Sequence, residues 1–300
     1  MKAGFVGVGQ MGGPMAANLA SSYEVVAHCR NESDRNSLQG SRVIVIEKLQ
    51  AVGDADVIFL CLPDAGIVEQ VLFGQGGLAE VLRPGVVVVD TSTIEYGATL
   101  SVSEKLALQE VRFVDAPISG MRARAEDGSL TMMCGGNPDL VDKLKPLFST
   151  MASNIIYMGE VGSGQLTKLI NQLLFDINAA ALAEILPMSV KLGLDPAKIG
   201  DVVNSGTGRS YASEFFIPHV LTGEFGKGYP MQHAYKDLIS GSEISAQHQI
   251  PTPVLSAAMA TYQTALLAGH GAKDKGGMIR IFEELLDVKF RSASLPGNPI

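Results

Sequence analysis

The segment that most constrains this chain is a glycine-rich turn near its start, Gly7-Val8-Gly9-Gln10-Met11-Gly12, which directly follows the apolar residues 3–6. Helix-forming residues follow at 15–20, and a second apolar run covers 23–28. A strand that turns through this G-x-G-x-x-G spacing into a helix presents free backbone N–H groups to a pyrophosphate. A turn without a ligand is the alternative, but the strand–helix–strand context favours a dinucleotide site.

Each glycine of this turn has a separate expected role. Gly7 makes the tight turn, Gly9 lets the backbone approach the phosphates, and Gly12 lets the helix pack on its strand. Gln10 and Met11 lie between them and belong to the same predicted cofactor-binding turn.

Composition limits the other classes of ligand. The chain has 300 residues, 46% hydrophobic and 18% charged, which suffices for a large core in one or two domains. A formal net charge of −8 disfavours binding to a nucleic-acid backbone, so we expect no nucleic-acid partner. Cys29, Cys61 and Cys134 are widely spaced without a C-x-x-C pair, which predicts buried thiols and neither disulfides nor a metal site.

No uninterrupted apolar run approaches the roughly 20 residues that span a bilayer, and no basic segment followed by an apolar one opens the chain. We therefore expect no membrane partner and a cytoplasmic location.

Up to about residue 160, short apolar runs alternate with amphipathic stretches, which predicts an α/β Rossmann-type doubly wound sheet over a dinucleotide-binding domain, residues 1–161. In such sheets ligands bind beyond the carboxyl ends of the strands. The predicted strands cover residues 2–6, 23–28, 42–46, 56–62, 86–90, 112–116, 130–134 and 154–157.

Residues 162–300 predict a second, all-helical domain for substrate binding and oligomerisation. Its first segment, 166–192, has no internal glycine and is apolar on nearly all sides, which predicts a long buried helix joining the domains. We expect this helix to lie between the domains or against another subunit. Pro187 predicts a bend or a local break near its end.

Lys168 is the first candidate catalytic residue. It lies in this apolar helix, four residues before Gln172 on the same face, with Asn171 beside them. Burial costs free energy for an unpaired lysine and lowers its pKa, which favours a role as acid or base near neutral pH. The alternative is an ammonium that extends to the surface. We expect the preceding glycines, Gly162 and Gly164, to admit a planar ring or a substrate.

A second candidate is the segment Asp115-Ala116-Pro117-Ile118-Ser119-Gly120 at the end of a predicted strand. A hydroxyl and backbone N–H groups in such a turn could bind a carboxylate. Read locally, the Pro-x-Ser-Gly pattern is more often a plain turn.

Taken together, these segments resemble the β-hydroxyacid dehydrogenase family, which includes 3-hydroxyisobutyrate dehydrogenase and tartronate semialdehyde reductase. Five signatures in the right order cover almost the whole chain, which makes the resemblance far more specific than any one motif. They are residues 4–12 with 14–16, residues 90–94, residues 115–120, residues 162–172 and residues 236–238.

The resemblance implies an active site in the cleft between a Rossmann domain and a helical domain. Lys168 would be the general acid/base, and Gln172 would help to orient the substrate. Hydride would move between the substrate carbon and a nicotinamide while Lys168 moves the hydroxyl proton. The implied substrate-binding residues are Ser119, Gly120, Met121, Asn171, Gln172 and Arg209; Leu62, Pro63, Thr93 and Lys236 would line the cofactor.

The chain also departs from the family pattern. Many relatives have glycine where this chain has Met121 and proline where it has Tyr96, so the substrate loop differs. Gln172 after Asn171 is similar to the tartronate semialdehyde reductase branch, whereas Gly208-Arg209-Ser210 is similar to the hydroxyisobutyrate branch. Arg209, with Arg122 and Arg124, could bind a second anionic group on the substrate, or could simply be solvated.

The end of the second predicted strand bears on the choice of nicotinamide. NAD-binding sites place an acidic residue about 20 residues beyond the glycines. Here the strand ends in His28-Cys29-Arg30-Asn31, where Arg30 suits a 2′-phosphate and Asn31 belongs to the same predicted cofactor-binding site. We therefore predict NADP as the preferred cofactor. The alternative is that Arg30 only ends a strand and that both NADP and NAD are accepted.

The sequence thus predicts an NAD(P)-dependent oxidoreductase that interconverts a small 3-hydroxy or ω-hydroxy carboxylic acid and its semialdehyde. An imine reductase-like enzyme and a non-catalytic NADP-binding scaffold are the alternatives, and Lys168 argues against both. A small carboxylate-bearing substrate is the expected partner, and a homodimer or homotetramer is the expected assembly.

Overall fold

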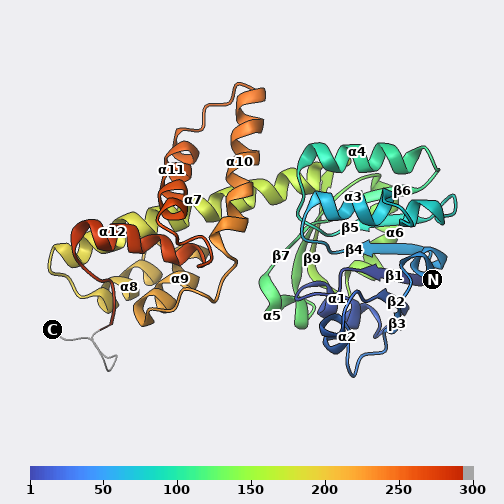
Figure 1. Ribbon diagram of the computed structural model, residues 1–300, viewed down its shortest axis with the longest axis horizontal. Coiled ribbons are helices and arrows are strands. Elements are labelled where there is room, and N and C mark those ends of the chain that lie inside the picture. The colour runs from blue at the N-terminus through green and yellow to red at the C-terminus, as the bar shows by residue number, and fades with distance from the viewer. Residues whose placement is uncertain (293–300) are drawn as a thin grey trace. The chain divides into compact units, whose positions relative to one another are not determined.

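A nine-stranded sheet forms the centre of residues 1–168, the first of two units into which the chain divides (Figure 1). Six of its strands follow the order β3-β2-β1-β4-β5-β6, and each pairs in parallel with its neighbours in that order. The strands are β1 (Lys2–Val6), β2 (Glu24–His28), β3 (Ile44–Ile46), β4 (Val57–Leu60), β5 (Val87–Asp90), β6 (Arg112–Asp115), β7 (Ile118–Ser119), β8 (Leu130–Gly135) and β9 (Ala152–Gly159).

This order confirms the predicted doubly wound sheet, because the winding reverses between β1 and β4. All eight predicted strands are present. The two-residue strand β7 was missed, since so short a segment has no measurable periodicity. It pairs antiparallel with β8, which also pairs with β6 and β9.

Alternating side chains of the central strands fill two separate cores. Phe5 and Phe59 pack on one face with α1 (Gly12–Leu19) and α6 (Pro138–Phe148). Val6 and Leu60 pack on the other face with α3 (Ala65–Phe73) and α4 (Tyr96–Ala107). Burial on both faces explains why these strands are continuous apolar runs. The remaining elements here are α2 (Glu32–Ser37), α5 (Met121–Glu126), η1 (Leu49–Asp54) and η2 (Leu78–Glu80).

The second unit, residues 169–300, is helical, as predicted. This computed structural model describes residues 1–292, so residues 293–300 of the predicted second domain lie outside the described part. Its described elements are α7 (Ser163–Lys191), which begins in the first unit, α8 (Pro196–Ser205), α9 (Tyr211–Thr222), α10 (Met231–Gln247), α11 (Pro253–Leu267), η3 (Lys275–Met278) and α12 (Ile279–Leu286).

Helix α7 continues through Pro187 to Lys191, so the local break is absent, while the bend that was the other expectation at Pro187 stays a prediction. A proline removes one helical hydrogen bond, but packing can hold the helix across it. Ala179, Ala183 and Leu186 are each buried in the core of the second unit. Cys29 and Cys134 are buried, Cys61 is half-buried, and all three are free thiols, as predicted.

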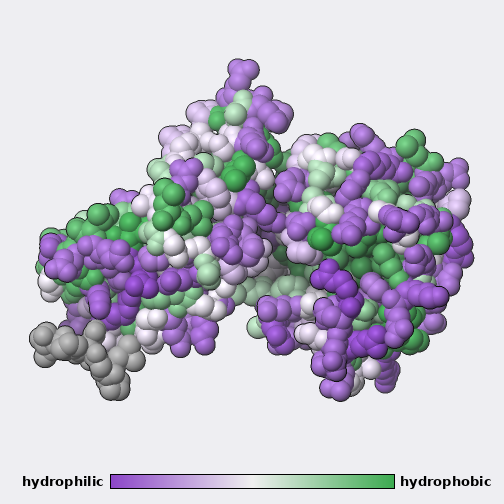
Figure 2. All heavy atoms as spheres, in the orientation of Figure 1, coloured by the Kyte–Doolittle hydropathy of each residue, from purple (hydrophilic) through white to green (hydrophobic). Residues whose placement is uncertain are grey.

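Only one side of α7 is buried within the chain. Leu174 is 59% exposed, Ile185 52% and Met188 48%. The face drawn in Figure 2 has hydrophobic surface on the second unit near the end of α7. Within residues 1–292 the helix therefore carries an exposed apolar stripe, and its expected burial between the domains or against another subunit stays a prediction.

By length and composition alone, α7 could cross a membrane: an 18-residue window in it has mean hydropathy 1.5, and 39% of that window is buried. It is the single such helix among residues 1–292. The expectation that no segment is apolar enough was wrong, because it considered uninterrupted runs whereas a window tolerates isolated polar residues. One such helix is weak evidence, since the core helix of a water-soluble domain passes the same test.

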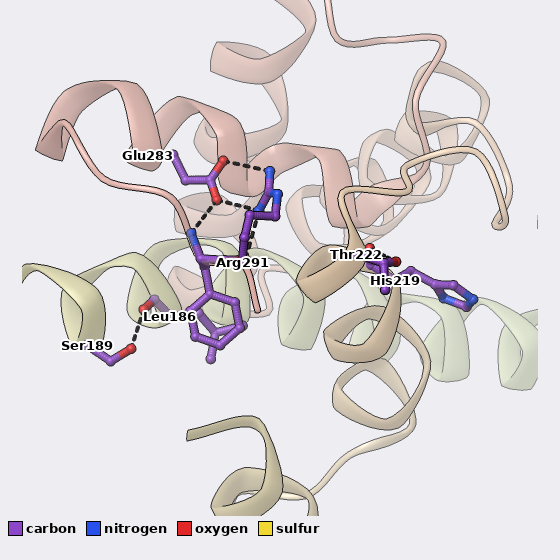
Figure 3. Close-up of polar contacts among 7 residues, drawn as sticks. Leu186, Ser189, His219, Thr222, Glu283 and Arg291 are labelled. Carbon is purple, nitrogen blue, oxygen red and sulfur yellow. Dashed lines mark hydrogen bonds and ion pairs between the residues drawn. The ribbon is translucent and has the colours of Figure 1, made fainter. Parts of the chain in front are cut away.

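A buried ion pair holds the end of the described chain on the second unit (Figure 3). Glu283 in α12 accepts hydrogen bonds from Arg291 at 2.7 and 3.1 Å and from the Phe290 N–H at 2.8 Å. Phe290 is fully buried. Ser189 and Thr222, in the same view, donate to the Leu186 and His219 carbonyls within their own helices.

We predict that Glu283→Ala lowers the free energy of unfolding by about 3 kcal/mol, because it leaves a buried guanidinium without its partner. Urea unfolding followed by circular dichroism measures the effect. Asp142→Ala, which breaks the exposed pair with Lys145, is the control and should cost less than about 1 kcal/mol. Equal losses in the two variants would contradict the prediction.

Candidate active site

The glycine turn between β1 and α1 has the geometry that its spacing predicts. Gly7 has φ +93°, and a Cβ there would overlap the Cys61 carbonyl. A Cβ on Gly12 would overlap the Gly7 carbonyl oxygen, whereas nothing lies within 4 Å of a Cβ on Gly9. The chain's own packing thus requires two of the glycines, and the third leaves its surface open to a ligand.

A hollow of ≈ 530 Å³ lies beside this open position. Gly9 and Gln10 line it, together with Ser33, Asp34 and Arg122 from α2 and α5. No side chain caps the N-terminus of α1, where Met11 is the capping residue, so its backbone N–H groups suit an anion. These features fit the pyrophosphate of a dinucleotide.

Of the two residues predicted to bind the cofactor after β2, one is exposed and the other caps a helix. Arg30 is exposed, and Asn31 accepts the Asp34 N–H at 2.9 Å as the N-cap of α2. That cap places the first turn of α2, including Ser33 and Asp34, beside the glycine turn. Sequence reasoning missed these two residues, although the Asn31 capping position was a signal for them.

The loops after β4 and β5 are hydrogen-bonded to each other. The Leu62 N–H donates to the Ser92 hydroxyl at 2.8 Å, and the Ser92 N–H donates to Asp90 Oδ1 at 2.9 Å. Pro63 is exposed and Thr93 is half-buried in these same loops. The predicted cofactor-lining residues Leu62, Pro63 and Thr93 therefore lie at one edge of the sheet.

The N-terminus of α7 is bound to that edge by a buried polar network. Asp115, at the end of β6, accepts the N–H groups of Gly162 at 2.7 Å and Gln165 at 2.9 Å. The Gln165 amide donates to the Ser92 carbonyl at 2.7 Å and accepts the Ile94 N–H at 3.3 Å. We call Ser92, Asp115 and Gln165 the α7 anchor.

Lys168 lies three residues after Gln165 on α7. It is buried, with 8% of the residue exposed. Burial is the condition under which a lysine is useful as an acid or base, and it disfavours the alternative of an ammonium extending into solvent.

The two glycines before Lys168 serve the chain's own packing. A Cβ on Gly164 would overlap the Met133 carbonyl and lie 2.7 Å from Asp115 Oδ2. Gly162 has φ +91°, and a Cβ there would overlap the Tyr96 ring. The room expected here for a ring or a substrate is thus already filled by protein.

The other polar turn, residues 115–120, separates into two parts. Asp115 belongs to the α7 anchor. Ser119 is half-buried in β7, opposite Thr131, and Gly120 leads into α5 with φ +142°. Met121 is exposed and has φ +60°, a backbone region that favours glycine, which gives a physical reason for the glycine that many relatives carry there.

The remaining predicted residues belong to the second unit. Gln172 donates to Asp237 Oδ2 at 3.4 Å, next to the half-buried Lys236 on α10. Asn171 is exposed. Arg209 is exposed before α9 and pairs with Glu214 at 3.6 Å. The structure thus brings Gln172 to the helix of Lys236 and leaves Arg209 in a surface ion pair.

Two buried carboxylates lie side by side at the edge of the sheet. Asp90 and Asp115 are register partners of β5 and β6, and both are fully buried. Burial raises the pKa of Asp90 to about 6, helped by the charge of Asp115, and burial also raises the pKa of Asp115. Asp90 Oδ2 has no hydrogen-bond partner within residues 1–292.

We predict that Asp90→Asn stabilises the protein above pH 6. The pKa of Asp90 is higher in the folded chain than the ordinary 3.8, so the folded state holds the proton more tightly. Wild-type stability therefore falls as pH rises from about 4 to 6, by about 3 kcal/mol at most. The melting temperatures of the two proteins should converge near pH 4 and separate by pH 7. A difference that does not change with pH would contradict this.

Comparisons with known proteins agree with this geometry. Residues 2–159 match the family model of the NAD-binding domain of 6-phosphogluconate dehydrogenase. Residues 162–282 match the model described as the NAD-binding domain of NADP-dependent 3-hydroxyisobutyrate dehydrogenase.

Relatives that align over nearly the whole chain are also dehydrogenases or reductases. The chain is 34% identical to the 2-(hydroxymethyl)glutarate dehydrogenase of Eubacterium barkeri, over 96% of this chain and 97% of that one. It is 28% identical to the 2-hydroxy-3-oxopropionate reductase of Escherichia coli, over 96% and 99%.

Among solved structures, the 3-hydroxyisobutyrate dehydrogenase of Salmonella typhimurium aligns with TM-score 0.85 at 28% identity, covering 94% of this chain and all of that one. Both family models and the relatives point to the same class. The chain belongs to the β-hydroxyacid dehydrogenase family of NAD(P)-dependent oxidoreductases, which act on CH–OH groups.

Proposed function

We propose that Lys168 is the general acid/base of an enzyme that interconverts a small 3-hydroxy or ω-hydroxy carboxylic acid and its semialdehyde. The observation that carries this proposal is a buried lysine placed directly after the α7 anchor, at the sheet edge where ligands of such folds bind.

The residues of this chain would divide the chemistry between them. When bound, the nicotinamide supplies or accepts the hydride. In reduction, the Lys168 ammonium donates its proton to the aldehyde oxygen, and in oxidation the neutral amine takes the hydroxyl proton. The Ser119 hydroxyl and the Gly120 N–H hold the substrate carboxylate, with Met121 and Asn171 beside it, and Gln172 orients the substrate.

We predict that Lys168→Ala lowers kcat by about 10²- to 10⁴-fold, the usual contribution of a positioned acid/base. NADPH affinity should change less than about twofold. Steady-state kinetics and a fluorescence titration of NADPH measure the two effects. Lys191→Ala is a matched control, because Lys191 lies on the same helix and donates to the Leu286 carbonyl. Unchanged kcat in Lys168→Ala would refute the assignment.

The substrate class can be narrowed by charge. The relative at 34% identity is named for 2-(hydroxymethyl)glutarate, a dicarboxylate. Arg122, Arg124 and Arg209 are candidates to bind a second carboxylate, although Arg122 now pairs with Glu126 at 2.7 Å and would have to exchange partners. The monocarboxylate aldehydes glyoxylate, succinic semialdehyde, methylmalonate semialdehyde and tartronate semialdehyde are compared by kcat/KM with a dicarboxylate semialdehyde, the aldehyde of 2-(hydroxymethyl)glutarate. If the dicarboxylate has no advantage, a site for a second carboxylate is excluded.

The proposed cofactor is NADP, bound through the glycine turn, with Gln10, Met11, Leu62, Pro63, Thr93 and Lys236 as further contacts. Arg30 and Asn31 would bind the 2′-phosphate. Asp34 in the neighbouring hollow is the one observation in favour of NAD.

We predict that Arg30→Ala raises the KM for NADPH by about 10- to 100-fold, the loss expected for charge-assisted hydrogen bonds, and leaves the KM for NADH within about twofold. Steady-state assays with both cofactors measure this. Similar KM values for the two cofactors, unaffected by the substitution, would show that Arg30 does not select the 2′-phosphate.

A homodimer or homotetramer in the cytoplasm completes the proposal, without nucleic-acid or membrane partners. The uncovered apolar stripe on α7 supports a second subunit, and three free thiols suit a reducing compartment. An imine reductase-like enzyme or a non-catalytic scaffold remains the alternative if no aldehyde oxidises NADPH in a Lys168-dependent way.

A further inference from the structure

We propose that Asp115 and Gln165 are positioning residues for Lys168, and that with Ser92 they fix where its ammonium lies relative to the loops after β4 and β5. This inference rests on the proposed acid/base role of Lys168. The sequence did not indicate this role. It presents Gln165 as a helix residue and Asp115 as part of an anion-binding turn.

Helix α7 is capped at its N-terminus by a residue that is distant in the sequence. The N–H groups of a helix's first turn are usually satisfied by a side chain just before the helix. Here Asp115 is the acceptor, 47 residues before Gly162 and 50 before Gln165, and each of its carboxylate oxygens takes one N–H group. A cap from a distant strand attaches the helix to the sheet as well as satisfying its donors.

The start of α7 is attached to the first unit's sheet at two separate segments. Asp115 ties the backbone of α7 to β6, and the Gln165 side chain ties it to the loop after β5 through both its donor and its acceptor. Two attachments to two segments fix the rotation of a helix about its axis. A rotation of about 10° would move an atom about 6 Å from the axis by about 1 Å. A misplacement of that size can lower a catalytic rate about 100-fold.

Ser92 connects the start of α7 to the loop of Leu62, one of the predicted cofactor-binding loops. The same Ser92 that accepts from Gln165 with its carbonyl accepts the Leu62 N–H with its hydroxyl. Ser92 and Gln165 are each about 2% exposed, so these bonds are not exchanged with water. One buried network therefore holds the start of α7 and the loop of Leu62 in a common frame.

The Asp115 carboxylate is closely packed on two sides. Gly164 and Gly135 both lie so close to the Asp115 carboxylate that a Cβ on either would come within 2.7 Å of its oxygens. The α7 anchor is thus rigid, and a change at Gln165 should be felt at Lys168 rather than absorbed by the first turn.

The test uses Gln165→Glu and Gln165→Met in the full-length enzyme. A protonated glutamic acid can still donate to the Ser92 carbonyl and accept from Ile94, whereas an ionised one cannot donate. We expect the kcat of Gln165→Glu to approach that of wild type at pH 5.5 and to fall at least tenfold below it by pH 8.5. Gln165→Met, similar in size without hydrogen bonds, should lose at least tenfold in kcat at every pH with little change in KM.

Thr99→Val is the matched control. Thr99 is fully buried in α4, donates to the carbonyl of Glu95, the N-cap residue of that helix, at 3.1 Å, and does not belong to the α7 anchor. It should keep wild-type kcat even if it melts at a lower temperature. A kcat ratio of Gln165→Glu to wild type that is constant with pH, or wild-type kcat in folded Gln165→Met, would overturn the proposal.

The comparison of pH values and a measurement of amide hydrogen exchange separate a failure of this proposal from a failure of folding or of the proposed function. If Gln165→Met does not fold, Gln165→Glu decides the question, because one folded sample is compared at two pH values. Amide hydrogen exchange at residues 163–168 reports on the anchor without any turnover, and we expect it to rise at least tenfold in Asp115→Asn; unchanged exchange there would also overturn the proposal. If wild type has no Lys168-dependent turnover, the proposed function fails, while this exchange still measures the anchor.

Discussion

The binding of the α7 N-terminus by the Asp115 carboxylate is the interaction on which the candidate site depends. It brings the end of β6 together with the first turn of the helix that carries Lys168, and Gln165 extends it to the loop after β5. The carboxylate remains buried at this position because it accepts hydrogen bonds from N–H groups at the positive end of a helix dipole. Burial nevertheless raises the pKa of Asp115, so the site combines a favourable contact with a real desolvation cost.

The same edge of the sheet collects the other functional candidates for a topological reason. The carboxyl ends of β1, β4, β5 and β6 are adjacent in the sheet order, and the loops after them hold the glycine turn, Leu62, Thr93 and the segment before Ser119. Residues about 30 positions apart in the chain thereby become neighbours. Parallel pairing alone places these loops on one side, whatever their individual sequences.

Much of this could be predicted from the sequence. The glycine spacing predicted the tight turn at Gly7 and the close packing at Gly12, because the positive φ of Gly7 and the contact between Gly12 and the Gly7 carbonyl are local. The Cys61 carbonyl that also requires a glycine at position 7 lies far along the chain. The strands were predictable because both faces of the sheet are buried and the runs are apolar throughout. Prediction failed where a distant partner decides: Gly162 and Gly164 suggested room for a ligand, yet Tyr96 and Met133 fill that space. The local break that was one of two expectations at Pro187 is absent for the same reason, since neighbouring residues such as Leu186 pack in the core of the second unit.

The sequence by itself determined the fold class and the glycine turn, because these follow from local spacing and from periodic burial. It indicated the family through the resemblance of five ordered segments to that family's signatures. It also predicted a role for Lys168, since a lysine in an apolar helix is conspicuous without any structure. Only the tertiary structure decided which residues bind the start of that helix. Asp115 and Gln165 interact across 50 positions of chain, and neither residue type signals such a contact, because hydrogen-bond geometry exists only once the strands and the helix have met.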